Sequence, residues 1–259
     1  MGRRCEYGAR NDVRLENREG VAFRGSDSAF RLRRFPAMNV FLKSLDAKGA
    51  ERFTTRLSRA TYEAGSLVAD FDDVSTDVFF IESGTVRVTI RNAGGREVIL
   101  GDLAAGEIVG DMAAIDDLPR SANISAIHRS TIARMPGRVF RELVTQVPEA
   151  AERMLRVLTS RVRLGNQRLL EAATLSLKYR VYAELLREAR LRPGGSQERS
   201  ISPPPLQHVL AARIGGRREA VSREIAELLR NGVLRRTPAA LIVVKPEWLE
   251  REVEAQWLD

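Results

Sequence analysis

The residues best suited to binding a ligand lie in a glycine-rich turn and at the arginine that follows it, within residues 106–122. A turn at Gly110 that opens into a short helix would present unpaired backbone N–H groups and the positive end of a helix dipole, and both favour an anion. Arg120 can donate a fork of hydrogen bonds to phosphate oxygens, and Ser121 can add a hydroxyl. Asp111, beside the turn, can accept a hydrogen bond from a sugar hydroxyl. These residue types together suit a ligand that carries a phosphate and a sugar.

A second segment, residues 209–225, carries side chains suited to reading DNA. Gly215 supplies a turn between two short helices, which is the arrangement of a helix–turn–helix. Arg218 and Arg223 can reach guanine acceptors in the major groove, and Glu219 can accept from a cytosine amine. Because an acid among basic residues weakens purely nonspecific phosphate binding, Glu219 favours sequence-specific recognition.

Neighbouring residues are expected to support this DNA contact. Arg217, just before the second helix, is expected to meet a phosphate, and Ser222 is placed with the DNA-binding residues within that helix. Arg213 and His208 are weaker phosphate candidates. For both, a solvated surface is the alternative interpretation, and for His208 it is the better one.

The elements that would position the glycine turn follow from the hydrophobic pattern. Residues 61–136 contain short apolar stretches cut by glycines, which indicates a β-sandwich or β-roll. The pattern predicts a hairpin made of strands 78–81 and 86–90 with its turn at 82–85. It also predicts a second turn at 92–95 and further strands at 98–100, 123–127 and 131–135.

From Pro148 to about residue 176 the period becomes helical. Apolar residues recur at alternating spacings of three and four, which makes a heptad seam of Leu155, Leu158, Val162, Gly165, Leu169 and Ala172. So narrow a stripe on so long a helix favours a dimer helix, and a helix packed on its own domain is the alternative. A second helix after Ser176, a polar loop at 192–197 and a closing hairpin at 234–244 complete the pattern.

Composition limits the classes of protein to which the chain can belong. A length of 259 residues suits one large domain or two ordinary ones, and 44% hydrophobic with 29% charged residues is typical of a globular protein. No apolar run approaches the roughly 20 residues of a membrane helix. The single cysteine, Cys5, excludes an internal disulfide, and two histidines argue against a histidine metal site. We therefore expect a cytoplasmic, metal-free protein.

The charge balance is basic, with 42 Lys and Arg against 34 Asp and Glu and a formal net charge of +8. The excess is concentrated in two places. Residues 1–37 hold nine arginines and five acids, and we expect this leader to be a disordered, solvated tail without a function of its own; an upstream translation start or a basic arm is the alternative. Residues 207–236 hold seven arginines and three acids, a patch that suits nucleic acid.

The glycine turn resembles the phosphate-binding cassette of the cyclic-nucleotide-binding domain, which CRP/FNR-type bacterial regulators share with protein-kinase regulatory subunits. The family pattern is Gly-Glu-Leu-Ala, a short gap, then Pro-Arg-Ala/Ser/Thr-Ala. This chain has GDMA at 110–113 and PRSA at 119–122, and residues 62–65 and 80–86 extend the resemblance. It implies ligand contacts from Gly110, Asp111, Met112, Arg120 and Ser121. Asp111 stands where the family has a ribose-binding glutamate, so this acid is one methylene shorter.

The same resemblance implies that the base is read from the long helix by two adjacent polar residues, one from each subunit. Gly165 and Asn166 hold these positions. Asn166 offers a donor and an acceptor, whereas Gly165 replaces the usual threonine and removes a donor. The implied allosteric ligand is cyclic AMP, with selectivity over cyclic GMP left open, and no other cofactor is implied. A degenerate β-roll that binds nothing is the alternative, although the retained Arg120–Ser121 pair argues against it.

Residues 218–223 (REAVSR) resemble the Arg-Glu-x-Val-x-Arg pattern that opens the recognition helix of the CRP/FNR family. The family has Ser or Thr before this pattern as a helix cap. Arg217 stands there in this chain, so the cap must come from elsewhere, such as the backbone of Gly216. Segments 234–236 and 241–244 would form the two strands of the wing.

The resemblance covers roughly residues 40–250 and implies an α+β fold: a jelly-roll-like cyclic-nucleotide-binding β-roll, a long dimerisation helix and a C-terminal winged helix–turn–helix. We assign residues 1–37 to the leader, 38–147 to the nucleotide-binding domain, 148–176 to the dimerisation helix and hinge, and 177–259 to the DNA-binding domain.

The predicted function is that of a homodimeric, cyclic-nucleotide-responsive transcription factor that binds palindromic double-stranded DNA. RNA polymerase is an expected partner, with the loop at 194–202 as a candidate contact. The sequence contains no triad, metal set or acid pair that indicates an enzyme. Two alternatives stay open: a regulator of the same type with another effector or an empty pocket, and a cyclic-nucleotide sensor or scaffold that does not bind DNA.

Overall fold

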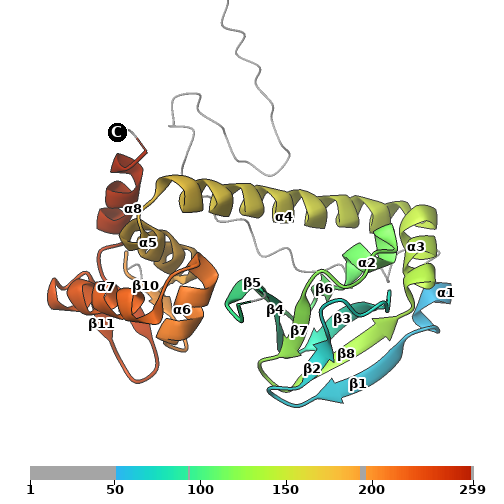
Figure 1. Ribbon diagram of the computed structural model, residues 1–259. Helices are drawn as coiled ribbons and strands as arrows, with labels where there is room; N and C mark the ends of the chain where they lie inside the picture. Colours follow the sequence, from blue (N-terminus) through green and yellow to red (C-terminus); the bar gives the residue numbers. More distant parts are fainter. Residues whose placement is uncertain (1–50, 93, 193–196, 258–259) are drawn as a thin grey trace, which may run out of the picture.

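The computed structural model describes residues 51–92, 94–192 and 197–257, in which one long helix joins a β-roll to a C-terminal helical unit (Figure 1). The predicted leader, residues 1–37, lies outside the described residues. The helices are α1 (Glu51–Thr54), α2 (Asp111–Asp116), α3 (Gly137–Gln146), α4 (Pro148–Thr174), α5 (Leu177–Glu188), α6 (Gln207–Ile214), α7 (Arg218–Arg230) and α8 (Pro246–Ala255). The strands are β1 (Ser58–Tyr62), β2 (Leu67–Ala69), β3 (Val78–Ser83), β4 (Thr85–Arg91), β5 (Glu97–Ala104), β6 (Ile108–Val109), β7 (Asn123–Ala126), β8 (Ser130–Met135), β9 (Arg190–Leu191), β10 (Arg199–Ile201), β11 (Leu234–Arg236) and β12 (Leu241–Val243).

Two antiparallel sheets, with strand orders β1-β8-β3-β6 and β2-β7-β4-β5, form the β-roll. The predicted strands are confirmed, and the turn at 92–95 joins β4 to β5 as an antiparallel pair. The predicted hairpin of residues 78–90 is wrong, because β3 and β4 belong to different sheets. The chain passes from one sheet to the other at Gly84, whose φ is +84°. A Cβ there would lie 2.3 Å from the Ser130 Oγ, so both the backbone and the space require glycine.

Strand β3 connects the interior of the β-roll to the helices outside it. Successive side chains of a strand point to opposite faces, and in β3 both faces are buried. Phe79 and Ile81 pack in the cluster that includes side chains from both sheets. Val78 and Phe80 pack in a second cluster, where the ring of Phe80 meets Phe140 of α3 at a centroid separation of 6.3 Å. The roll therefore holds α3, and through it the start of α4.

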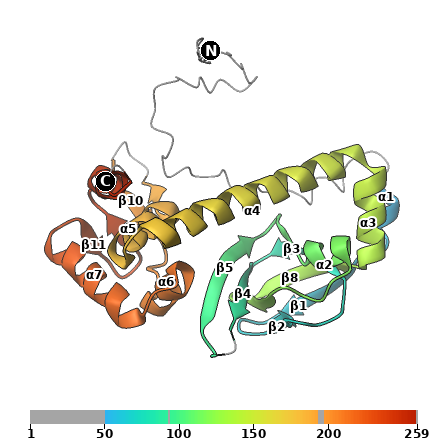
Figure 2. The same ribbon diagram turned by 45° about the horizontal axis from the view of Figure 1, so that its top comes forward.

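Helix α4 is 27 residues long and extends from the β-roll to the C-terminal unit (Figures 1 and 2). Pro148 stands in its first turn, where the missing N–H would have no helical partner in any case. Ala150, Met154 and Val157 are buried in the cluster that also contains β3 and α3 side chains. Near the other end of the helix Glu171 is buried. The long helix predicted from the sequence is confirmed.

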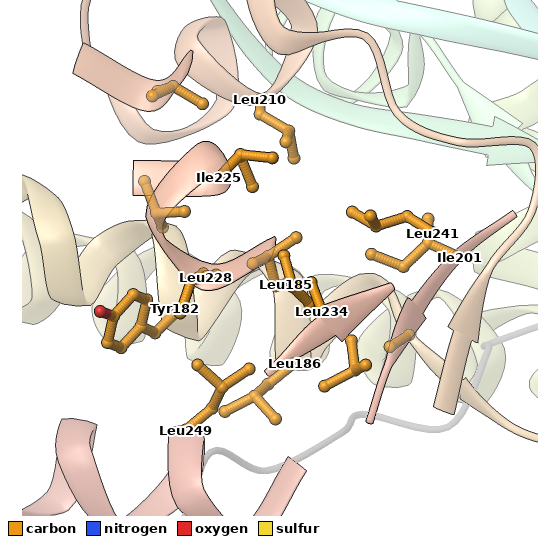
Figure 3. Packing of buried hydrophobic residues seen from close by; sticks show 14 of the residues in the cluster. Tyr182, Leu185, Leu186, Ile201, Leu210, Ile225, Leu228, Leu234, Leu241 and Leu249 are labelled. Atoms are coloured by element: carbon orange, nitrogen blue, oxygen red, sulfur yellow. The ribbon is translucent and has the colours of Figure 1, made fainter. Parts of the chain in front are cut away.

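The C-terminal unit is a winged helix–turn–helix made of α5, α6, α7 and a sheet of order β11-β12-β10-β9. Its core joins Leu185 of α5, Leu210 of α6 and Leu228 of α7 to apolar residues of the sheet (Figure 3). The predicted helices and the closing hairpin are confirmed. Helix α8 was not predicted from the sequence, and it adds Leu249 and Val253 to this core.

Candidate ligand pocket and DNA-binding helix

The glycine turn has the backbone geometry that the cassette requires. Gly110 caps α2 in the left-handed region, with φ +84°, and a Cβ at this position would lie 2.6 Å from Arg120 Nη1 and 2.8 Å from the Asp77 carbonyl oxygen. A side chain at position 110 would therefore displace the arginine. Gly110 and Arg120 thus depend on each other for their placement, which explains in physical terms why the two belong to one motif.

Arg120 is buried, with 3% of the residue exposed. Its Nη1 donates to the Gly110 carbonyl at 3.0 Å, and its Nη2 donates to Ser75 Oγ at 3.0 Å and to the Asp77 carbonyl at 2.6 Å. Its Nε is buried and has no hydrogen-bond partner within the described residues. A guanidinium has five N–H donors, so these bonds leave the Nε donor and one Nη1 donor for another acceptor.

Asp111 meets a partner that sequence reasoning missed. Arg161 of α4 donates from Nη1 to both carboxylate oxygens of Asp111, at 2.8 and 2.7 Å, and from Nη2 to the Ile108 carbonyl at 2.8 Å. The carboxylate was predicted to accept from a sugar hydroxyl, and in the structure Arg161 holds it while the residue is only 1% exposed. The signal in the sequence was spacing, since Arg161 lies one helical turn before Gly165 and so shares its side of α4.

These residues line a cavity of about 990 Å³ between the cassette and α4. Of the predicted ligand residues, the lining includes Gly110, Asp111, Met112, Arg120, Ser121 and Gly165. Burial raises the pKa of Glu107, which also lines the cavity, against the opposing effects of the Ala104 backbone and Arg161. Asn166 is not among the lining residues and is exposed on α4. A Cβ at Gly165 would meet no other atom within 4 Å, so this position is open in the single subunit.

Every residue of the predicted seam of α4 except Leu158 is exposed in the single subunit. Leu155, Val162 and Leu169, spaced seven apart, are 65%, 60% and 69% exposed. Leu158 differs from the prediction, since it is partly buried and packs against the cluster that holds α3 and the β-roll. Three large apolar side chains thus form a stripe along α4 that the subunit itself does not cover.

The helix–turn–helix places most of the predicted DNA-binding residues on its surface. Gly215 ends α6 with a φ of +64°, and α7 begins at Arg218. Arg217, Arg218, Glu219 and Arg223 are exposed, and Ser222 is partly exposed. Arg217 occupies the cap position without a side-chain capping hydrogen bond. The N-terminal end of α7, from its cap residue Arg217 to Arg223, therefore carries three exposed arginines and the exposed acid Glu219.

Arg213 differs from the prediction of a phosphate contact. Its side chain is only 9% exposed, because Nη2 pairs with Asp102 of β5 at 2.7 Å and Nη1 pairs with Glu184 and Glu188 of α5. These acids satisfy its charge within the protein. His208, the other weak candidate, is exposed on α6.

No group of three or more potential metal ligands among His, Cys, Asp and Glu occurs in the part of the chain that the structure describes. In that same part, no helix has both the length and the apolar character needed to cross a membrane.

Comparisons with known proteins match the β-roll and the C-terminal unit to two known domains. Residues 59–147 match the model of the cyclic nucleotide-binding domain, and residues 179–252 match the Crp-like helix-turn-helix domain. A CRP-like cAMP-activated global transcriptional regulator of Mycobacterium tuberculosis is 25% identical over 76% of this chain and 89% of its own length. A cyclic AMP receptor protein of Thermus thermophilus is 29% identical over 74% of this chain and 86% of its own.

Among solved structures, a mutant of CooA from Carboxydothermus hydrogenoformans shares the fold with a TM-score of 0.71, at 19% identity over 86% of this chain and 98% of that one. The fold and the two matched domains define a CRP-like transcriptional regulator with a cyclic-nucleotide-binding domain and a helix–turn–helix. The chain belongs to the CRP/FNR family.

Proposed function

We propose that this regulator binds cyclic AMP, acts as a homodimer and recognises palindromic operators in the cytoplasm, where it works together with RNA polymerase. The observation that carries the proposal is the cavity that the cassette shares with α4, because it brings Arg120 and Gly165 to one space. We retain residues 38–147, 148–176 and 177–259 as its nucleotide-binding, dimerisation and DNA-binding parts. The expected polymerase contact at 194–202 lies partly outside the described residues.

The ligand would sit with its phosphate at the cassette. The two N–H donors that Arg120 has left, the amides at the start of α2 and the Ser121 hydroxyl supply donors for a singly charged cyclic phosphate. The ribose would share Asp111 with Arg161, since each carboxylate oxygen can accept more than one hydrogen bond. Relatives named as cAMP-activated or as a cyclic AMP receptor support cyclic AMP as the effector.

Replacing Arg120 with alanine is expected to weaken cyclic AMP binding about 100-fold, about 2.8 kcal/mol, because the phosphate loses its charged partner. Isothermal titration calorimetry of the full chain measures this directly. Arg129→Ala is the matched control, since it removes an arginine of the same roll that is 75% exposed. Arg120 also donates hydrogen bonds to Ser75 and to the Asp77 carbonyl, so its loss could unfold this part of the roll. A thermal melt of the alanine variant, and the charge-conserving variant Arg120→Lys, separate lost binding from lost folding. Unchanged affinity in a folded Arg120→Ala protein would contradict the assignment.

Base selectivity is expected to be loose, because Gly165 offers no side-chain donor and leaves open space. Cyclic GMP should therefore bind within about two orders of magnitude of cyclic AMP, a difference of about 2.8 kcal/mol or less. Competition binding with both nucleotides measures the ratio, and Gly165→Thr should widen it. If cyclic GMP fails to bind at about millimolar concentration, Gly165 does not loosen the site.

The stripe on α4 supports a dimer in which Leu155, Val162 and Leu169 of two subunits pack together and Asn166 of the partner subunit reaches the base. Val162→Glu would place two carboxylates against each other across this seam, and we expect it to convert the dimer to monomers at micromolar concentration. Arg163→Glu, on the exposed neighbouring residue, serves as the control. Sedimentation equilibrium distinguishes the two, and a dimeric Val162→Glu protein would place the interface elsewhere.

A two-fold dimer would present α7 twice, so the operator should be an imperfect palindrome. The two half-sites should lie about 34–36 Å apart, because both helices must enter successive major grooves on one side of the duplex. Resemblance to the family implies a half-site core close to TGTGA, read by Arg218, Glu219 and Arg223.

A further inference from the structure

One part of the β-roll surface, beside the cassette, carries three exposed apolar side chains, which we call the apolar patch. Phe71 and Val74, in the loop between β2 and β3, are 49% and 80% exposed, and Leu118 is 61% exposed. Backbone hydrogen bonds of 2.9 Å join residues 72–73 to Arg120, so the two segments that carry the patch lie side by side. Exposed apolar patches with a polar rim often mark sites of interaction.

Acidic side chains surround the apolar patch. Four exposed acids stand within two residues of it in the chain and have no salt bridge within the described residues: Asp70, Asp72, Asp73 and Asp116. The backbone amide and the hydroxyl of Ser75 donate to Asp73 at 3.0 Å and lower the pKa of this exposed carboxyl, so it is charged at neutral pH. Two further acids are already paired, Asp77 with Arg134 and Asp117 with Arg141. The patch therefore fits a segment that carries both apolar and basic side chains.

The leader of this chain contains a segment of that composition. Residues 30–35 read FRLRRF, so three arginines stand among two phenylalanines and a leucine. This segment lies outside the described residues. Its apolar side chains match the apolar patch in kind, and its arginines are opposite in charge to the unpaired acids around it.

The chain between this segment and the first described residue is long enough for the contact. Residues 36–50 can span up to about 50 Å when extended. A unit of about 80 residues, the size of the β-roll, has a radius of gyration of about 12 Å, so its whole surface is within reach. The described chain also begins close to the patch. Phe53 of α1 and Phe140 of α3 share one cluster, and the next residue of α3, Arg141, pairs with Asp117.

We propose that residues 30–35 dock on the apolar patch of their own subunit, with their arginines against the unpaired acids. The leader is then a basic arm rather than the tail without a function that its composition suggests. A segment tethered in this way has an effective concentration of about 1 mM, so an intrinsic dissociation constant of about 0.1 mM gives about ten docked molecules for each free one. Docking would stabilise the backbone pairing of residues 72–73 with Arg120, and it depends on neither ligand nor DNA.

Protection from trypsin tests the docking in the full-length protein. Trypsin cleaves after Arg31, Arg33 and Arg34 when the segment is free, so the cleavage rate at these residues follows the free fraction. The double variant Val74→Ser/Leu118→Ser should be cleaved there about ten times faster than the parent, because the docked state is lost. Mass spectrometry of the first leader fragments measures the rate in nucleotide-free buffer.

Leu191→Ser is the matched control, because it removes a leucine that is as exposed as Leu118, 62% against 61%, but lies in the C-terminal unit. Its leader should be cleaved at the rate of the parent. A parent cleaved as fast as a free peptide of residues 26–40, or a double variant cleaved no faster than the parent, would overturn the docking site. Protection that rises with protein concentration would assign the contact to a second copy of the chain and overturn docking within the subunit.

Hydrogen exchange tests the same contact from the side of the roll. The leader variant Phe30→Ser/Leu32→Ser/Phe35→Ser leaves every residue of the roll unchanged, so a change in the roll must come from lost docking. Peptides that cover the apolar patch should exchange faster in this variant than in the parent or in Phe23→Ser, which removes an apolar side chain elsewhere in the leader. Equal exchange in all three proteins would overturn the proposal.

Discussion

Arg218→Ala is expected to cost about 1–3 kcal/mol at each half-site, and so about 2–6 kcal/mol for a symmetric dimer on its operator. Arg218 is the first residue of α7 and is exposed. The N-terminal residues of a recognition helix are those that meet base edges. The loss should be largest for sequences with guanine at one position of the half-site, since the missing side chain read that base.

Arg217→Ala is the matched control, because it removes an exposed arginine one residue earlier, at the cap position outside the helix. A phosphate contact carries no base information, so this variant should weaken all sequences alike and reduce the salt dependence. Selection from a duplex with a randomised half-site compares the two. If Arg218→Ala lowers affinity equally for every sequence, α7 does not read DNA as we propose.

Glu184→Gln is expected to lower the free energy of unfolding by about 3 kcal/mol, because it removes the buried carboxylate that Arg187, Arg168 and Arg213 share. Glu184 is 1% exposed and pairs with Arg187, Arg168 and Arg213. Urea denaturation of the full chain measures the loss. Glu152→Gln, whose carboxylate is 63% exposed beside Arg156 on α4, should change the free energy of unfolding by less than about 1 kcal/mol.

The contribution of Glu184 to the free energy of unfolding should depend on pH. Burial alone would raise the pKa of Glu184, but Arg187, Arg168 and Arg213 lower it below the 4.5 of a free glutamate. The stabilisation from a lowered pKa is complete above that unfolded value, and it is lost as pH falls from there through the lower pKa of the folded protein. The difference between the parent and Glu184→Gln should therefore be full near neutral pH and shrink in acid. A constant difference from about pH 7 to pH 3 would contradict the charged assignment.

The sequence predicted elements better than it predicted how strands pair. The alternation of apolar residues located β3 and β4 correctly, and the glycine at position 84 marked the turn between them. A turn of this kind can join two strands of one sheet or carry the chain to another sheet. At Gly84 the chain crosses to the other sheet, where the glycine packs closely against Ser130 of β8. The local sequence does not reveal this contact, because Ser130 is distant in the chain.

In the candidate sites too, the sequence predicted contacts within a motif and missed contacts between residues that are distant in the chain. Gly110 and Arg120 were recognisable from their residue types and from the resemblance to the family's motif, and they lie in contact. The pairing of Asp111 with Arg161 joins residues 50 apart, and the pairing of Arg213 with Asp102 joins residues 111 apart. A sequence pattern places a basic residue on the solvent-facing side of a helix. It does not show that the β-roll and the C-terminal unit can bury that residue between them, where it pairs with an acid. Arg213, predicted to meet phosphate, is instead paired within the protein, whereas Arg218 is exposed and its contact with DNA stays a prediction.

The most direct test of the regulator that we propose is the affinity of the full-length protein for a fluorescent duplex with two inverted TGTGA half-sites, measured by anisotropy with and without saturating cyclic AMP. We expect cyclic AMP to tighten binding at least about tenfold, and a duplex with scrambled half-sites of equal length to gain little. Equal affinity for the two duplexes, or no change on addition of cyclic AMP, would contradict a cyclic-AMP-responsive, sequence-specific regulator.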